Sequence, residues 1–194
     1  ELRAESVFSG GVLVARDGAA LWKRSPAPPP PAPSMAVSLD ELDLTIRHRS
    51  DKVRVIRAIP DQIVTGTEIL EPSISGEEIV ADPDRDILKI VVVERHVGSG
   101  RVGLGLVSGI GLQRGAIAGT VAHDHHNIIA VGVDDESILT AVGEVVALEG
   151  VLSVTDGKTV LSSLRLPVGG LMSESPIEEV RAALDRVVDS ARPL

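Results

Sequence analysis

The stretch DILKIVVVERH, residues 86–96, decides the fold. Its long apolar run predicts a strand that is buried on both faces, at the centre of a sheet. KVRVIRAI (52–59) and EEIVAD (77–82) precede it and also read as strands. The segment that follows, residues 97–119, is punctuated by glycine and serine, which predicts short strands joined by tight turns.

Two helices are expected near the C-terminal end. Residues 134–150 change to helical periodicity, with acidic residues in the first turn and Gly150 placed to end the helix. One face of this helix carries Ile138, Val142, Val145 and Val146. The second helix has Ser175 as its predicted N-cap, Pro176 at the first helical position and Glu178 closing a capping box. Its apolar stripe comprises Ile177, Val180, Leu184, Val187 and Val188.

A hairpin around Asp156-Gly157 separates these helices. Strands and helices follow one another without a regular βαβ repeat, which favours an α+β fold with a mixed sheet.

The N-terminal part differs from the rest. Residues 6–25 predict two or three short strands turning at Gly10-Gly11 and Asp17-Gly18. PAPPPPAPS (26–34) then predicts an extended linker. We therefore expect a small β remnant at 1–24, a Pro-rich linker at 25–37 and the main domain at 38–194. Such a remnant cannot bury its own face, so we expect the chain to begin inside a larger protein.

Composition excludes several classes of function. The formal net charge is −9 and aromatic residues make up 1% of the chain, so we expect no nucleic-acid partner. There is no cysteine, which excludes zinc fingers and cysteine enzymes. The apolar runs are much shorter than the roughly 18 to 20 residues of a membrane span, so no membrane partner and a cytoplasmic location are expected.

The sequence HDHHN, residues 123–127, lies between two apolar strands and concentrates polar side chains. If it is extended, His123 and His125 share one face, as a metal-binding His-x-His pair would. A dinuclear centre needs more ligands from a barrel of about 250 residues, which this chain is too short to hold. Two alternatives stay open: a structural turn capped by Asp124 and Asn127, or side chains that face a substrate or an interface.

A second polar group follows the central strand. Glu94, Arg95 and His96 precede a Gly-Ser-Gly loop, where they either line a site or stabilise the sheet edge. The glycines of GLGLVSGIG (103–111) suggest a phosphate loop, but the spacing and the terminal Gly-Lys-Ser/Thr are missing. Turn geometry is the favoured interpretation.

Together these stretches resemble the C-terminal region of the bacterial adenine deaminases, in the amidohydrolase superfamily. The similar segments are 52–65, 77–132, 156–174 and the closing helix. The family pattern reads His-Asp-Ser-His-Asn, so His125 departs from it, while His123, Asp124, His126 and Asn127 match, as do Glu94, Arg95 and His96. The apparent His-x-His pair is made by that departure.

The resemblance implies a whole enzyme that hydrolyses adenine to hypoxanthine and ammonia at a dinuclear manganese or iron centre. The metal ligands and catalytic groups would lie on a barrel, in cis or in trans, and none is expected here. The seven matching residues are candidates for a substrate pocket or a domain interface. A homo-oligomer is expected. The alternatives are a purely structural or oligomerisation domain and a stand-alone purine-binding module.

Overall fold

The computed structural model describes residues 4–22, 29 and 34–194. The chain divides into two compact units, Glu1–Pro30 and Pro31–Leu194. Most of the predicted linker lies outside the described residues. We describe each unit by itself.

The first unit is a three-stranded antiparallel sheet of β1 (Ser6–Ser9), β2 (Val12–Arg16) and β3 (Ala19–Ala20). The predicted turns at Gly10-Gly11 and Asp17-Gly18 are confirmed, and all four residues have positive φ. Its identity as the remnant of the small β domain that flanks an amidohydrolase barrel stays a prediction.

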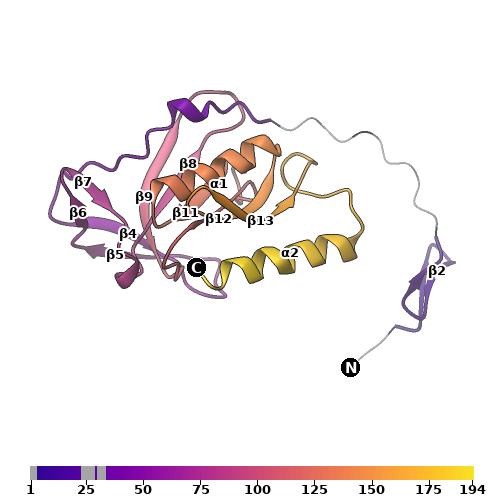
Figure 1. The fold of residues 1–194 in the computed structure, drawn as a ribbon. Coiled ribbons are helices and arrows are strands. Elements are labelled where there is room, and N and C mark those ends of the chain that lie inside the picture. The colour runs from indigo at the N-terminus through magenta and orange to yellow at the C-terminus, as the bar shows by residue number, and fades with distance from the viewer. Residues whose placement is uncertain (1–3, 23–28, 30–33) are drawn as a thin grey trace. The chain divides into compact units, whose positions relative to one another are not determined.

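An eight-stranded sheet forms the second unit (Figure 1). In sheet order its strands are β13 (Thr159–Arg165), β12 (Val151–Asp156), β10 (Ala116–Gly119), β11 (Ile128–Gly132), β8 (Leu88–Val93), β9 (Val102–Ser108), β4 (Val53–Arg57) and β5 (Gly66–Leu70). Only the β4–β9 pair is parallel. With α1 (Asp135–Ala147) and α2 (Ile177–Ala191), this confirms an α+β fold with a mixed sheet.

The predicted central strand is β8, which pairs with β11 on one side and β9 on the other. Residues 52–59 supply β4, as expected. Residues 77–82 supply β7 (Glu78–Val80), which pairs with β6 (Ser73–Ser75) in a separate hairpin. Short 3-10 turns lie at Leu39–Glu41 and Pro83–Arg85. The hairpin at Asp156-Gly157 is confirmed by β12 and β13.

One face of the large sheet, here called the covered face, is closed by this chain. Over its middle lies α1, whose Ile138, Val142 and Val145 are fully buried against Val91 and Ile128. Segment 35–48 and the β6–β7 hairpin cover the rest, through partly buried residues such as Val37 and through Leu44 and Ile79. The main core therefore lies on this side of the sheet.

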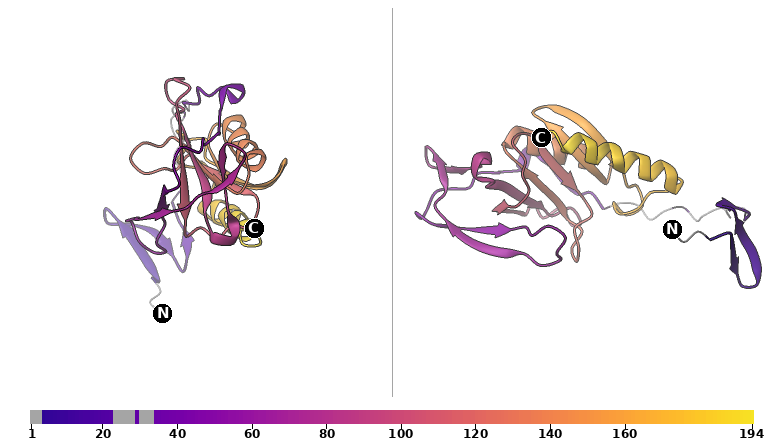
Figure 2. Two further views of the ribbon diagram at one scale, coloured as in Figure 1. Left: turned by 90° about the vertical axis from the view of Figure 1, so that its left-hand side faces the viewer. Right: turned by 90° about the horizontal axis from the view of Figure 1, so that it is seen from below.

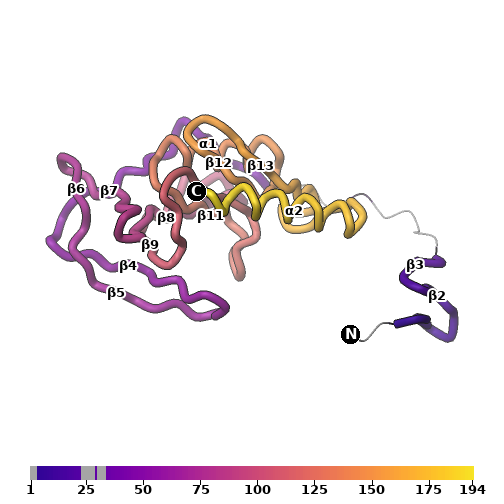
Figure 3. Tube along the Cα trace, turned by 60° about the horizontal axis from the view of Figure 1, so that its bottom comes forward, coloured from indigo at the N-terminus to yellow at the C-terminus, as the bar shows by residue number. Residues whose placement is uncertain are grey.

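The opposite face, here called the open face, is covered only in part. Helix α2 packs there against β12 and β13, at one end of the sheet (Figures 1 and 2). The β4–β5 hairpin runs at the other end (Figure 3). Two rows of laterally paired positions cross this face on β12, β10, β11, β8 and β9. The first row is Leu152, Gly119, Ile129, Val92 and Gly103, and the second is Val154, Ile117, Val131, Ile90 and Gly105.

Helix α1 ends at Ala147, and both Glu149 and Gly150 after it have positive φ, 58° and 126°. The N–H groups of Glu149 and Gly150 donate to the carbonyls of Val146 and Val145, as in a Schellman motif. A Cβ at Gly150 would lie 2.4 Å from the Cα of Gly170, so this glycine is required for close packing.

The predicted capping box of α2 is wrong. Pro176 is the N-cap, with a ψ of 147°, and its carbonyl accepts the first helical hydrogen bonds, from Glu179 and Val180. There is no side-chain cap, because the proline side chain has no hydrogen-bond acceptor. The stripe is also narrower than expected: Val180, Leu184 and Val187 pack on the sheet, whereas Ile177 is 77% exposed.

The glycine-rich segment 97–119 supplies two strands, β9 and β10, joined by tight turns, so the expected short strands and turns are confirmed, although β9 is seven residues long. Gly109 and Gly111 have positive φ and form the predicted turns. Gly103 and Gly105 lie inside the strand, so the turn interpretation is wrong for them. None of the described helices is long and apolar enough to span a membrane.

Candidate functional site

The two polar groups singled out in the sequence meet at one end of the sheet. Loop 94–101 joins β8 to β9, and loop 120–127 joins β10 to β11. Val93 and Ile128 are laterally paired at the ends of their strands, which places the two loops side by side. We call these two loops, with segment 167–172 after β13, the loop edge.

Arg95 holds the loop edge together from inside. Its side chain is among the largest that are fully buried. Nε donates to the carbonyl of His126 at 2.6 Å, Nη1 to that of Ser34 at 2.7 Å and Nη2 to that of Gly169 at 2.9 Å. Burial lowers the pKa of Arg95, but an arginine stays charged at neutral pH. One buried cation thus joins three separate segments through their carbonyl oxygens.

Residues that sequence reasoning missed complete this network. The Thr120 hydroxyl donates to the carbonyl of Gly170. A Cβ at Gly170, whose φ is 76°, would lie 3.1 Å from the Arg95 guanidinium, so the position needs glycine. The Gly169-Gly170 pair in the sequence signalled a tight turn, but nothing in the sequence connected that turn to Arg95.

Glu94 faces its own loop. Its carboxylate accepts hydrogen bonds from the N–H groups of His96, Val97 and Ser99 and from the Ser99 hydroxyl. The Ser99 N–H, followed by those of Val97 and His96, holds the pKa of Glu94 at about 2. The carboxylate therefore orders the Gly-Ser-Gly loop and stays ionised at neutral pH.

His96 links the 120–127 loop to Ser34, which lies before the main sheet in the sequence. Its Nε2 lies 3.0 Å from the carbonyl of His125, and its Nδ1 lies 2.7 Å from the Ser34 hydroxyl. A carbonyl can only accept, so Nε2 carries a proton and donates to it. Both ring nitrogens therefore have hydrogen-bond partners.

The HDHHN segment is a turn, so the extended arrangement considered from the sequence is wrong. Asp124 and His126 have positive φ, 72° and 47°, and the His126 N–H donates to the carbonyl of Ala122 at 2.7 Å. The His125 Nδ1 accepts from the N–H of Asn127 at 3.1 Å. His123 and His125 consequently do not form a strand-borne ligand pair.

The tip of this turn points into solvent. The His123 Nδ1 lies 3.0 Å from the Asp124 Oδ1, and the two side chains are 94% and 85% exposed. Among residues 4–22, 29 and 34–194 there is no group of three or more His, Cys, Asp or Glu side chains that could hold a metal ion. These residues do not fit a dinuclear centre, and we derive no chemical step through a metal here.

Two of the candidate residues have polar atoms that are buried without a hydrogen-bond partner in the described part of the chain. These atoms are His126 Nδ1 and Asn127 Oδ1. Buried polar atoms nearly always have a hydrogen-bond partner, so two adjacent residues that each have a buried atom without one call for an explanation. Unlike the polar groups of Glu94, Arg95 and His96, which are already paired, these two atoms would gain partners if the side chains rotated toward another molecule or domain.

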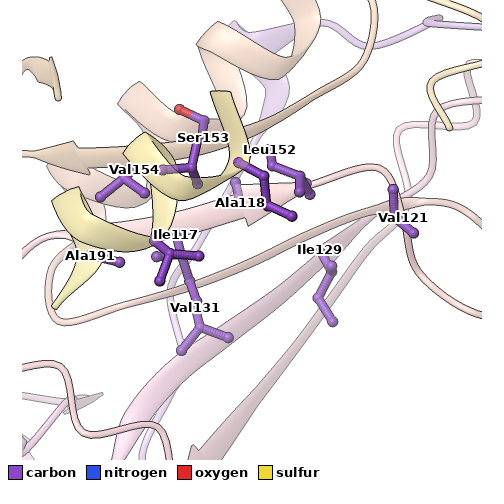
Figure 4. A pocket seen from close by; sticks show the side chains of 13 residues that line it. Ile117, Ala118, Val121, Ile129, Val131, Leu152, Ser153, Val154 and Ala191 are labelled. Carbon is purple, nitrogen blue, oxygen red and sulfur yellow. The ribbon is translucent and has the colours of Figure 1, made fainter. Parts of the chain in front are cut away.

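A groove lies next to the loop edge, on the open face (Figure 4). It has a volume of about 380 Å³ and runs between α2 and strands β10, β11 and β12. Its lining is apolar apart from Ser153, and includes Ile117, Ile129, Leu152, Val187 and Val188. None of the candidate site residues lines this groove. Val121, which is 51% exposed at the start of the 120–127 loop, connects the two regions.

Comparison with known proteins agrees with these features. Residues 62–194 match the family described as adenine deaminase C-terminal domain. The chain is 48% identical over its full length to an adenine deaminase of Desulfatibacillum aliphaticivorans and 43% identical to one of Dehalococcoides mccartyi, and covers 34% of each. An adenine deaminase of Bacillus pumilus is 40% identical over 92% of the chain, which covers 32% of that protein. The chain thus spans about a third of the length of these relatives, and it belongs to the adenine deaminase C-terminal domain family.

Proposed function

We propose that this chain is the C-terminal domain of an enzyme that hydrolyses adenine to hypoxanthine and ammonia, and that its loop edge faces the catalytic part of that enzyme. The observation that carries the proposal is the pair of unsatisfied atoms, His126 Nδ1 and Asn127 Oδ1. They lie in the turn whose backbone Arg95 holds in place.

The arrangement suits a preorganised surface. The buried Arg95 donates a hydrogen bond to the carbonyl of His126, and His96 donates one to the carbonyl of His125, so both carbonyls are held in place. With the backbone held at both residues, the side chains of His126 and Asn127 need little further ordering to bind a partner. The two buried atoms, an imidazole nitrogen and an amide oxygen, would complement the hydrogen-bonding groups of a purine or of polar residues on a neighbouring domain once a change of side-chain rotamer exposes them.

The chemistry itself is assigned to the remainder of the enzyme. A dinuclear manganese or iron centre there would activate the attacking water, with adenine as substrate. This chain would contribute positioning and closure of the site and no metal ligand. A cytoplasmic location, a role in purine metabolism and assembly into a homo-oligomer belong to the same proposal.

Alanine substitutions in a full-length enzyme carrying this domain test the proposal. We expect Asn127→Ala to lower kcat/KM for adenine by about tenfold, because one hydrogen bond to a buried partner is lost. His123→Ala reports on the exposed tip of the same turn, and Lys158→Ala, at the opposite end of β12, is the matched control. Deaminase activity and sedimentation are measured for each variant.

A structural role is the second candidate, and the apolar open face favours it. Under that alternative Asn127→Ala changes assembly or stability and leaves turnover per assembled enzyme unchanged. Lower turnover with unchanged assembly supports the proposal. Unchanged turnover and assembly in both Asn127→Ala and His123→Ala contradicts the loop edge as part of the site.

A further inference from the structure

The open face carries apolar side chains, although this chain covers only part of it. Its two rows comprise ten positions on five strands, and every one is apolar or glycine. The face of an antiparallel sheet that meets solvent normally carries polar residues at alternate positions. Here Val92 and Ile129 remain only partly buried at the centre of the first row, and neither belongs to the buried cluster that α2 helps to form.

Gly103 points to something that approaches this face closely. It lies inside β9 with no positive φ, and a Cβ there would meet only the Cβ of Val92, at 3.8 Å, which is an ordinary contact. The fold of this chain therefore does not require glycine, although glycine weakens a strand. Gly119 differs, because a Cβ there would lie 2.7 Å from Leu152 Cδ2.

The groove beside α2 extends the same surface. Leu152 and Ile129 of the first row form part of its lining, and Val188 of α2, 42% exposed, stands on its other side. Figure 4 shows these apolar side chains around the cavity without a charged group among them. An apolar groove that continues a flat apolar sheet is the shape that an element of another domain fills.

The length of the relatives identifies the occupant. This chain accounts for 34% of the D. aliphaticivorans protein, and the other two-thirds belong to the same polypeptide. A tethered domain reaches a nearby surface at a far higher effective concentration than a second molecule does. We propose that the open face is the surface on which the catalytic two-thirds of the same polypeptide docks, with part of it against Gly103 and in the groove.

This inference rests on the proposed function and adds the location of the contact. The first row directly adjoins the loop edge. Val92 lies two residues before Glu94, and its paired residue Ile129 lies two residues after Asn127. A domain seated on the open face therefore lies beside His126 and Asn127. The docking surface and the candidate site become two parts of one interface.

Cysteine labelling tests the contact directly, because the chain contains no cysteine of its own. The chain replaces the C-terminal third of the D. aliphaticivorans enzyme in a full-length fusion. Val188→Cys reports on the groove, and Lys158→Cys, whose side chain is 84% exposed at the β12–β13 turn, is the control. Maleimide labelling is followed peptide by peptide with mass spectrometry, in the fusion and in the isolated chain.

We expect labelling at position 188 to be at least about tenfold slower in the fusion than in the isolated chain, with labelling at position 158 unchanged. Gly103→Val should leave the Tm of the isolated chain unchanged or higher, yet restore fast labelling at position 188 in the fusion. Equal rates at position 188 in the fusion and the isolated chain would overturn the inference.

The occupant is decided by the same rates. If labelling of the isolated chain is slow and becomes faster on dilution, a second copy covers the face and the inference is wrong. A third outcome is slow labelling of the isolated chain that does not depend on concentration and becomes fast when residues 1–30 are deleted. That result would mean that the β1–β3 unit covers the open face, and it would also overturn the inference. If position 188 is protected in a fusion that does not deaminate adenine, the result supports the contact and contradicts the proposed function. If the fusion deaminates adenine and position 188 is not protected, the result supports the proposed function and contradicts the contact.

Discussion

The two faces of the large sheet differ in how completely this chain covers them, although the central strand β8 carries apolar residues toward both. On β8, Val91 is fully buried under α1, whereas its neighbour Val92 points to the open face and is only partly covered. The alternation continues past the strand end, with Arg95 buried and Glu94 partly exposed. An apolar strand thus predicts burial on both faces, and in this chain that prediction holds fully only for the face under α1.

The largest expected effect comes from placing a charge on either side of β8. Val91→Asp should destabilise the isolated chain by about 5 kcal/mol or more, enough to unfold a marginally stable domain, because an unpaired carboxylate is buried. Val92→Asp should cost only about 1 kcal/mol, because this face meets water. Urea unfolding followed by circular dichroism compares them. Equal losses would mean that the two faces do not differ in cover.

Removing the buried cation at the end of the same strand ranks second. Arg95→Ala should lower the free energy of unfolding by about 3 kcal/mol, since three buried carbonyls lose a charged donor. Arg101→Ala, at an exposed position in the same loop, should stay within about 0.5 kcal/mol. Thermal unfolding of both variants gives the comparison. A small loss for Arg95→Ala would show that the loop edge is held by other contacts.

Two strand glycines offer a matched pair of smaller effects. Gly132 lies on the covered face, where a Cβ would come within 2.7 Å of Ala116 Cβ and Ile138 Cγ1. We expect Gly132→Ala to destabilise the isolated chain by about 1 to 3 kcal/mol through overpacking. Gly103→Ala on the open face should stabilise it by about 0.5 to 1 kcal/mol. Destabilisation by Gly103→Ala would reveal an internal reason for that glycine.

The smallest effect is local and depends on pH. The pKa of Glu94 is about 2 in the folded chain against an ordinary 4.5, so its contribution is complete above about pH 4.5 and is lost as the pH falls toward 2. The amide resonance of Ser99 should titrate with a midpoint near 2. Glu94→Gln should abolish that titration. A midpoint near 4.5 would mean that the loop does not hold the carboxylate.

Much of the fold could be predicted because its signals are local. The apolar run of β8, the periodicity of α1 and the Asp156-Gly157 turn each lie within a few residues, and all three are confirmed. Features that depend on contacts between residues far apart in the chain were missed. Gly150 takes part in the expected helix end but is also needed beside Gly170, and Gly103 was expected in a turn, yet it lies in a strand.

The candidate site shows the same division. Both polar motifs were identified from the sequence, and the family pattern had already discounted the His-x-His pair. Their adjacency could not be seen, because it follows from the pairing of β8 with β11 across 35 positions, from Val93 to Ile128. The separate roles of the motif members also emerged only in three dimensions: His96 is satisfied at both ring nitrogens, whereas His126 Nδ1 is buried without a partner in the described residues.

By itself the sequence determined the elements, the α+β class and the family, because periodicity, turn residues and long motifs are properties of neighbouring positions. Only the tertiary structure decided which face of the sheet is closed and what Arg95 holds. Burial and hydrogen bonding depend on segments brought together from Ser34, His126 and Gly169, and their distance along the chain leaves no local pattern to read.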